Sequence, residues 1–121
     1  MCAGARIWCE LTSPSKRKGS AFELEVARYL AAHGFPDAER AYGAGRPDDR
    51  GDIAGVPGVA IECKAVRAMD LAGWMTEAKR EAENAGGKLA VVVAKRRMAS
   101  VSRAYVVMEL EQWCELAKGS E

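Results

Sequence analysis

Hydrophobic residues recur along the chain with two different periods, and the first period is typical of a helix. Ser20 is placed to cap such a helix, with Glu23 at the capping-box position three residues later. Gly34 stands where the pattern stops, as glycine often does beyond a helix end. The apolar positions at helical spacing are Phe22, Val26 and Leu30. The pattern therefore predicts a helix from about residue 20 to residue 33.

The second period is the alternation typical of a strand, and the most informative residues of the chain lie in this segment. The apolar run 59–66 follows the turn signal 55–58, and residues 51–54 precede that turn. We predict that the two segments pair as a hairpin. Because side chains alternate between the faces of a strand, Glu62 and Lys64 should project together. Cys63 should point to the opposite face.

The rest of the chain continues the pattern of an α/β protein. A second helix is predicted from Asp70 to Gly86, a buried central strand over residues 89–94, and a last helix from Leu110 to Gly119. Short strands are expected at 38–42 and 104–108. The polar side of the second helix is predicted to carry Glu77, Lys79, Arg80 and Glu83, and its apolar side Leu71, Trp74, Met75, Ala78, Ala82 and Ala85.

These elements predict a mixed β-sheet flanked by helices, in the order α-β-β-β-α-β-β-α. A chain of 121 residues with 49% hydrophobic and 29% charged residues suits one globular domain. We assign it to residues 18–121 and expect residues 1–17 to form a flexible arm. Without a signal-peptide pattern or a membrane-length apolar run, a cytoplasmic setting is expected, in a bacterium, an archaeon or a virus-infected host cell.

The predicted hairpin brings two carboxylates and one amine together. Asp52 directly precedes the strand at Ile53, so the turn can set it beside Glu62, with Lys64 on the same face. Hard cations such as Mg²⁺ bind one or two carboxylates and activate water, which a nearby lysine can orient. Asp48 and Asp49 in the preceding loop compete with Asp52 for the metal role, and Lys64 alone could be an ordinary strand lysine.

Glu23 admits two interpretations. At about 100° per residue it lies within the apolar stripe of the first helix, so it should face inward. A carboxylate facing a core is costly unless it is paired or metal-bound, which makes Glu23 a candidate third acidic member of the site. Alternatively, it completes a capping box with the amide of Ser20.

Charge gives a local rather than a global signal. The net charge is +1, so nothing draws the whole molecule toward nucleic acid. Two basic clusters, 16–18 and 95–97, could contact phosphates or could be ordinary solvated charge.

The order and spacing of these motifs resemble a known superfamily. The residues 18–23 (KGSAFE), then Arg40, then 51–53 (GDI), then 61–64 (IECK) are similar to the PD-(D/E)xK nucleases, and within them to the archaeal-type Holliday junction resolvases. The resemblance covers about residues 18–107. It implies a restriction-endonuclease-like fold and a homodimeric endonuclease that cuts four-way DNA junctions by paired nicks, with Mg²⁺ as cofactor and Mn²⁺ as a substitute.

The resemblance also implies roles for individual residues. Asp52 and Glu62 would be metal ligands, Lys64 would position or activate the attacking water, and Glu23 would complete the acidic site. Arg40 would lie near the scissile phosphate. The other residues expected to contact DNA are Lys18, Arg46, Lys95, Arg96 and Arg97.

One difference from those resolvases keeps alternatives open. They usually carry a serine in the loop before the metal aspartate, and residues 42–46 contain none, although Tyr42 or Arg46 could take over its phosphate contact. The alternatives are another nuclease of the superfamily, acting on duplex, flap or single-stranded DNA, and a non-catalytic DNA-binding module. For the expected homodimer, the helix stripe at Trp74 and Met75 is a candidate contact.

Overall fold

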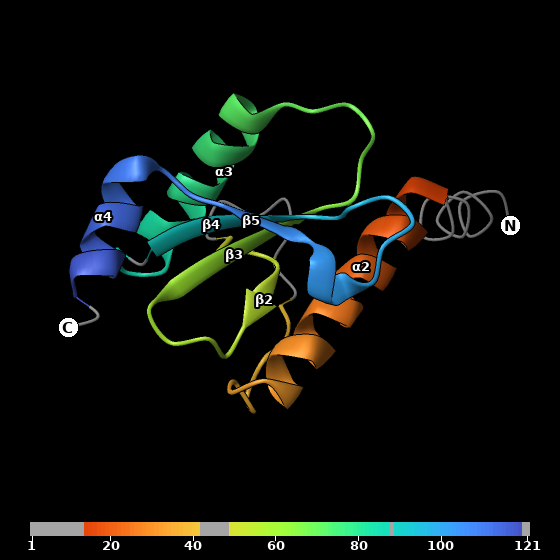
Figure 1. Ribbon diagram of the computed structural model, residues 1–121, viewed down its shortest axis with the longest axis horizontal. Helices are drawn as coiled ribbons and strands as arrows, with labels where there is room; N and C mark the ends of the chain where they lie inside the picture. The colour runs from red at the N-terminus through yellow and green to blue at the C-terminus, as the bar shows by residue number, and fades with distance from the viewer. Residues whose placement is uncertain (1–13, 42–48, 88, 120–121) are drawn as a thin grey trace, which may run out of the picture.

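The computed structural model describes residues 14–41, 49–87 and 89–119. Over these residues the chain forms a five-stranded mixed sheet with helices on both faces (Figure 1). The elements follow the predicted order, with a short 3-10 helix added before the last strand. Their bounds are α2 Pro14–Ala32, β1 Glu39–Arg40, β2 Ile53–Ala54, β3 Val59–Lys64, α3 Leu71–Asn84, β4 Leu89–Ala94, η1 Val101–Arg103, β5 Tyr105–Val107 and α4 Leu110–Lys118.

The strands lie side by side in the order of the sequence, β1-β2-β3-β4-β5. β2 and β3 form the predicted antiparallel hairpin, with Ile53 opposite Ile61. β3 and β4 are parallel, so α3 has to carry the chain back between them. The other neighbouring strands pair antiparallel. In this order β1 and β5 are the edge strands of the described sheet.

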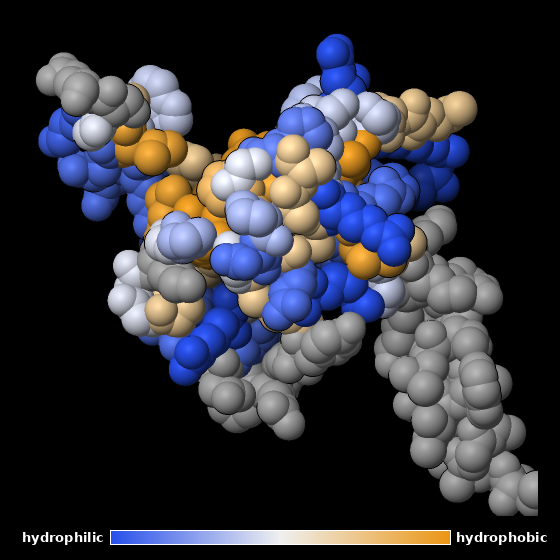
Figure 2. Space-filling model, turned by 90° about the horizontal axis from the view of Figure 1, so that it is seen from below, coloured by the Kyte–Doolittle hydropathy of each residue, from blue (hydrophilic) through white to orange (hydrophobic). Residues whose placement is uncertain are grey.

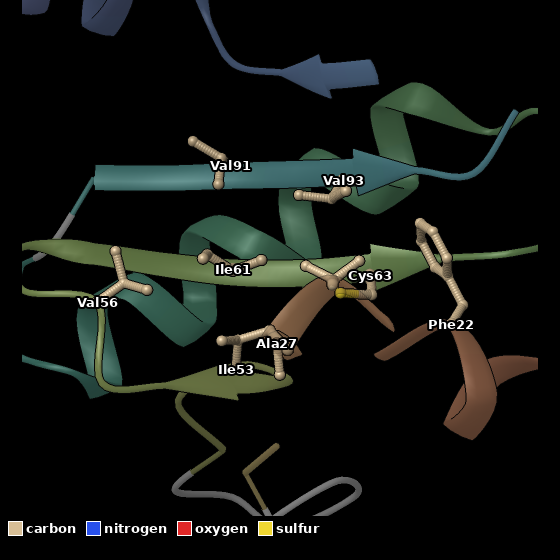
Figure 3. Packing of buried hydrophobic residues seen from close by; sticks show 9 residues of the cluster. Phe22, Ala27, Ile53, Val56, Ile61, Cys63, Val91 and Val93 are labelled. Atoms are coloured by element: carbon tan, nitrogen blue, oxygen red, sulfur yellow. The ribbon is translucent and has the colours of Figure 1, made fainter. Parts of the chain in front are cut away.

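Two cores lie on opposite faces of the sheet because the side chains of β3 and β4 alternate. On the α2 face, Phe22 packs with Ile61, Cys63, Val91 and Val93 (Figure 3). The α3 face is built mainly from small residues. Its buried members are Ala60, Trp74, Ala78, Ala82, Ala90, Val92 and Ala94. Cys63 therefore points away from Glu62 and Lys64, as predicted.

The first helix begins earlier than the sequence predicts. α2 starts at Pro14, so Ser20 lies inside the helix and cannot cap it. Proline is well tolerated in a first helical turn because its missing N–H would have no partner there. The last four residues of the expected arm, 14–17, thus belong to α2. The predicted end is confirmed, since the helix stops at Ala32 and Gly34 has a φ of +108°.

The helices that follow differ in how well they are covered. Asp70 caps α3 by accepting a hydrogen bond from the Gly73 N–H, and Trp74 on this helix is only 8% exposed. Trp74 is therefore a core residue. α4 buries none of its residues and leaves Leu110, Trp113 and Leu116 more than half exposed. Among the described residues, no helix has both the length and the apolar character required to cross a membrane.

Candidate active site

β3 carries the centre of the candidate site on the face that meets α3. Glu62 is almost fully buried, at 3% exposure, and Lys64 is partly buried. The Lys64 Nζ donates to Glu77 Oε1 of α3 at 3.1 Å. The carboxyl group of Glu77 also lies within hydrogen-bonding reach of Glu62. Glu62 and Lys64 therefore project together, as strand alternation predicts.

Asp52 is held rigidly just before β2. One of its carboxylate oxygens accepts the Cys63 N–H at 2.8 Å, and its own N–H donates to the Ile61 carbonyl at 2.7 Å. Gly51 lets the chain approach so closely, because its φ is +110° and a Cβ there would lie 2.8 Å from the Ile61 carbonyl oxygen. This geometry sets the Asp52 carboxyl within hydrogen-bonding reach of Glu62.

Helix α3 adds two carboxylates that the sequence analysis did not assign to the site. Oxygen atoms of Glu62, Glu77 and Glu81 lie within 4.8 Å of one another. Glu77 was expected on the polar side of the helix, and its side chain is partly exposed, but it also contacts Lys64. Glu81 is only 1% exposed. It follows Trp74 by seven residues, which is about 20° away on a helical wheel, so the same arithmetic used for Glu23 would have found it.

Crowding of these carboxyl groups shifts their proton affinities in opposite directions. Burial, with a hydrogen bond to Asp52, raises the pKa of Glu62 far above its usual range. Burial also raises the pKa of Glu81, to about 7. The pKa of Glu77 is lowered instead, by its hydrogen bond to Glu62 and then by that to Lys64. The cluster therefore holds shared protons when nothing else offsets its charge.

Lys64 keeps its positive charge in this setting. Burial works to lower its pKa, but the charge of Glu62 and the hydrogen bond to Glu77 outweigh burial, so the pKa is raised. A lysine of this kind donates hydrogen bonds and stabilises negative charge at neutral pH. It is not available as a proton acceptor there.

Glu23 lies near Asp52 but is engaged elsewhere. Its Oε1 accepts from Arg40 Nε at 3.2 Å, and Arg40 also donates to Ser20 Oγ at 3.4 Å. Burial and the charge of Asp52 raise the pKa of Glu23. The capping-box interpretation is wrong because the helix begins at Pro14. Glu23 faces inward as predicted, yet in the described residues it is not part of the close group of three glutamates.

Asp49 has a structural task in the loop that precedes Asp52. Its carboxylate accepts the Gly51 N–H at 2.9 Å, and its carbonyl accepts Asn84 Nδ2 of α3 at 2.8 Å. It forms a turn, as expected for a loop aspartate, but it is buried rather than solvated. Asp48 and the two loop candidates for phosphate contact, Tyr42 and Arg46, lie outside the described residues.

The basic residues after β4 lie at the Lys64 end of the sheet. The Lys95 N–H donates to the Lys64 carbonyl at 2.9 Å, and the Lys95 ammonium lies 6.0 Å from the centre of the Phe22 ring. Arg96 lies over the Tyr105 ring at 5.1 Å, and Arg97 is exposed. Lys18 belongs to α2, and its side chain lies outside the described part of the chain.

The site residues fit a hard divalent cation. Two buried oxygens, Glu62 Oε2 and Glu81 Oε2, lack a hydrogen-bond partner within the described residues. Buried carboxylate oxygens are costly to leave unsatisfied, and carboxylates are the ligands that Mg²⁺ and Mn²⁺ prefer. Comparison of the chain with family models, curated proteins and solved structures finds no match. The motifs and this geometry are therefore the basis for proposing a function.

Proposed function

We propose that the protein is a Mg²⁺-dependent endonuclease of the PD-(D/E)xK type that acts on structured DNA, with four-way junctions as its favoured substrate. The observation that supports this proposal most directly is the convergence of three side chains: Asp52 lies beside Glu62, and Lys64 projects from the same face of β3. These are the residues, in the order along the chain, that the resemblance assigns to metal binding and water positioning.

Each side chain has a task that its surroundings support. Asp52 and Glu62 would hold the cation, which supplies polarisation of the phosphate and activation of water when bound. Asp52 is oriented for this by the Cys63 N–H. The Lys64 ammonium would orient the attacking water and offset negative charge on the phosphate. Arg40 and Glu23 would support the site from the α2 side through their ion pair.

The segment 95–97 would bind the DNA backbone. It leaves the sheet beside the backbone of Lys64, and the Lys95 ammonium lies near the Phe22 ring on the α2 side. Contacts of this kind recognise backbone shape rather than base sequence, and their strength falls steeply with salt concentration. Both features suit an enzyme selective for DNA structure.

The test is cleavage of a labelled four-way junction beside a matched linear duplex, in Mg²⁺ and in EDTA. We expect paired nicks near the crossover that require Mg²⁺ and that fall by about 100-fold or more in Asp52→Asn and in Lys64→Ala, the size typical of a lost electrostatic catalytic group. Matched controls are Asp37→Asn and Lys79→Ala, whose side chains lie on the surface away from the site.

The outcomes separate the alternatives. Cleavage of duplex, flap or single-stranded DNA in preference to the junction would keep a nuclease of this superfamily and exclude the junction as favoured substrate. Absence of cleavage with any divalent cation, together with salt-sensitive DNA binding, would favour the non-catalytic module.

The proposal includes a homodimer, with a contact other than the one first considered. Trp74 is buried in its own core. The exposed apolar side chains of α4, with Val106 of β5, form the contact surface that we propose. A stable interface takes roughly 800 Å² from each partner. Val106 and Leu116 line a cavity of about 340 Å³ on the α2 face, and hydrophobic surface gathers beside the lobe on the left of Figure 2, where α4 lies. The side chains are Val106, Leu110, Trp113 and Leu116.

Sedimentation at micromolar concentration tests this contact. An exposed apolar patch beside a cavity can pair with the same surface of a second copy about a two-fold axis. We expect a dimer mass for the native chain and a monomer mass for Trp113→Glu. A native monomer would contradict the homodimer.

A further inference from the structure

The close approach of α3 to β3 creates a cluster of carboxylates larger than the proposed nuclease needs. Glu77 and Glu81 are four residues apart, so they lie on the same face of the helix. That face packs against the end of β3, where both reach Glu62. The three groups present oxygen atoms within 4.8 Å of one another.

Protein groups balance this negative charge only in part. Lys64 donates to Glu77 Oε1 at 3.1 Å, and the charge of Arg80 also acts on Glu77. Asp49 and Asp52 add further negative charge beside Glu81. Glu62 and Glu81 are each more than nine-tenths buried, and each directs an oxygen without a hydrogen-bond partner in the described residues. Such oxygens require a donor or a cation.

We infer that Glu77 and Glu81 of α3 join Glu62 in a site for a hard divalent cation of the Mg²⁺ or Mn²⁺ class, so that α3 adds two carboxylate ligands to the pair, Asp52 and Glu62, proposed above. The inference rests on the proposed function only in taking this ion to be the one that the nuclease uses. Neither helix residue belongs to the motif on which the resemblance is based.

The inferred ion site is buried on one side and open to solvent on the other. Glu62 and Glu81 supply buried oxygens, whereas the side chain of Glu77 is 37% exposed and opens the cluster to solvent. Glu77 Oε1 accepts from Lys64, which holds this carboxylate at the solvent side of the cluster. An ion of this class keeps several water ligands, and the exposed side leaves room for them. Lys64 would remain beside the ion through its bond to Glu77.

Direct ion binding tests the inference without reference to DNA. Mn²⁺ is titrated into the full chain, and bound ion is measured by electron paramagnetic resonance and by the rise in melting temperature. Removing one anionic ligand in Glu81→Gln or Glu77→Gln should weaken Mn²⁺ binding by about tenfold or more, since affinity follows ligand charge. The matched control is Glu83→Gln, an exposed glutamate on the same helix that should bind Mn²⁺ like the native chain.

The melting temperature without metal shows whether each variant folds. Glu81→Gln removes a buried charge, so its metal-free melting temperature should equal or exceed that of the native chain, while the rise caused by Mn²⁺ is largely lost. Native-like Mn²⁺ affinity in both Glu77→Gln and Glu81→Gln, or no Mn²⁺ binding to the native chain at millimolar concentration, would overturn the inference.

Failure of the inference differs from failure of the proposed function. If Glu81→Gln loses Mn²⁺ while the native chain cuts no DNA, the ion site stands and the nuclease proposal fails. If the native chain cuts DNA and both glutamine variants bind Mn²⁺ normally, the nuclease proposal stands and the helix ligands do not.

Discussion

The two faces of the sheet differ in chemistry, although the same two strands, β3 and β4, form the centre of both. The face toward α2 is hydrocarbon, with Phe22 and Val26 packed on Ile61, Val91 and other branched residues, and part of it remains open as a cavity. The face toward α3 is lined mainly by alanines and holds buried carboxylates at one end. The face toward α2 contributes hydrophobic packing, and the face toward α3 holds the candidate site.

Residue size explains why the carboxylates meet on one face and not on the other. Ala60, Ala78 and Ala90 are fully buried where α3 crosses the sheet, and such small side chains let a helix approach a sheet closely. Glu77 and Glu81 can therefore reach Glu62 over a short distance. On the opposite face, larger side chains fill the space between α2 and the sheet with apolar contacts. Close packing is thus a condition for the candidate ion site.

The largest expected effect comes from damaging the apolar face alone. Phe22 is 1% exposed, and Phe22→Ala should lower the free energy of unfolding by about 3–5 kcal/mol, through lost burial and a cavity. Mn²⁺ affinity of the folded protein should not change, because the ion ligands lie across the sheet. Urea denaturation and Mn²⁺ titration measure the two quantities, with Leu24→Ala as the exposed control on the same helix. A parallel loss of affinity would show that the faces are coupled.

A smaller effect should follow pH and arise from the carboxylate face. The folded-state pKa of Glu81 is about 7, above its usual value of 4.5, so the fold binds more protons than the unfolded chain between these values. The contribution of Glu81 to metal-free stability should be full below about pH 4.5 and be lost as pH rises through 7, a change of about 3–4 kcal/mol at most. Glu62 shifts in the same direction, whereas the lowered pKa of Glu77 opposes part of the change.

Urea denaturation in EDTA from pH 5 to 8 measures this decline, and excess Mn²⁺ should remove most of it. In Glu81→Gln the slope should be shallower. A metal-free stability that rises over the same range would contradict the assignment of protons to the cluster.

The smallest effect should come from the residue between the two central side chains. Cys63 lies between Glu62 and Lys64 in sequence but packs on the α2 face. Cys63→Ala removes one buried sulfur atom and should cost only about 1 kcal/mol of stability. Its Mn²⁺ affinity and DNA cleavage should match those of the native chain, because only its backbone N–H contacts Asp52. Reduced ion affinity would show that strand alternation does not separate the faces.

Local sequence patterns predicted what local geometry determines. Alternation along β3 placed Glu62, Cys63 and Lys64 on their correct faces, and the turn at residues 55–58 gave the hairpin. Glycine and aspartate marked the ends of α3. In each case the decisive interaction lies within a few residues along the chain, so the sequence records it directly.

The sequence-based predictions failed where contacts between residues far apart in the chain determine the structure. Helical spacing placed Glu77 on the polar side of α3 and gave no sign that it would reach Lys64 and Glu62 of β3. Ser20 and Glu23 formed a plausible capping box, yet α2 continues back to Pro14, and Glu23 pairs with Arg40 of β1 instead. Neither the parallel pairing of β3 with β4 nor the packing of α3 follows from local periodicity. These tertiary contacts determine which carboxylates converge.

The crossover of α3 between two parallel strands has a consequence for local unfolding. Two of the three inferred ligands lie on this one helix, and the third lies on the strand that precedes it. Any fluctuation that lifts α3 from the sheet would release both helix ligands at once. A bound ion would oppose that opening and slow amide hydrogen exchange in α3 more than in α2. Ion occupancy could then be read as a difference in amide hydrogen-exchange protection between α3 and α2.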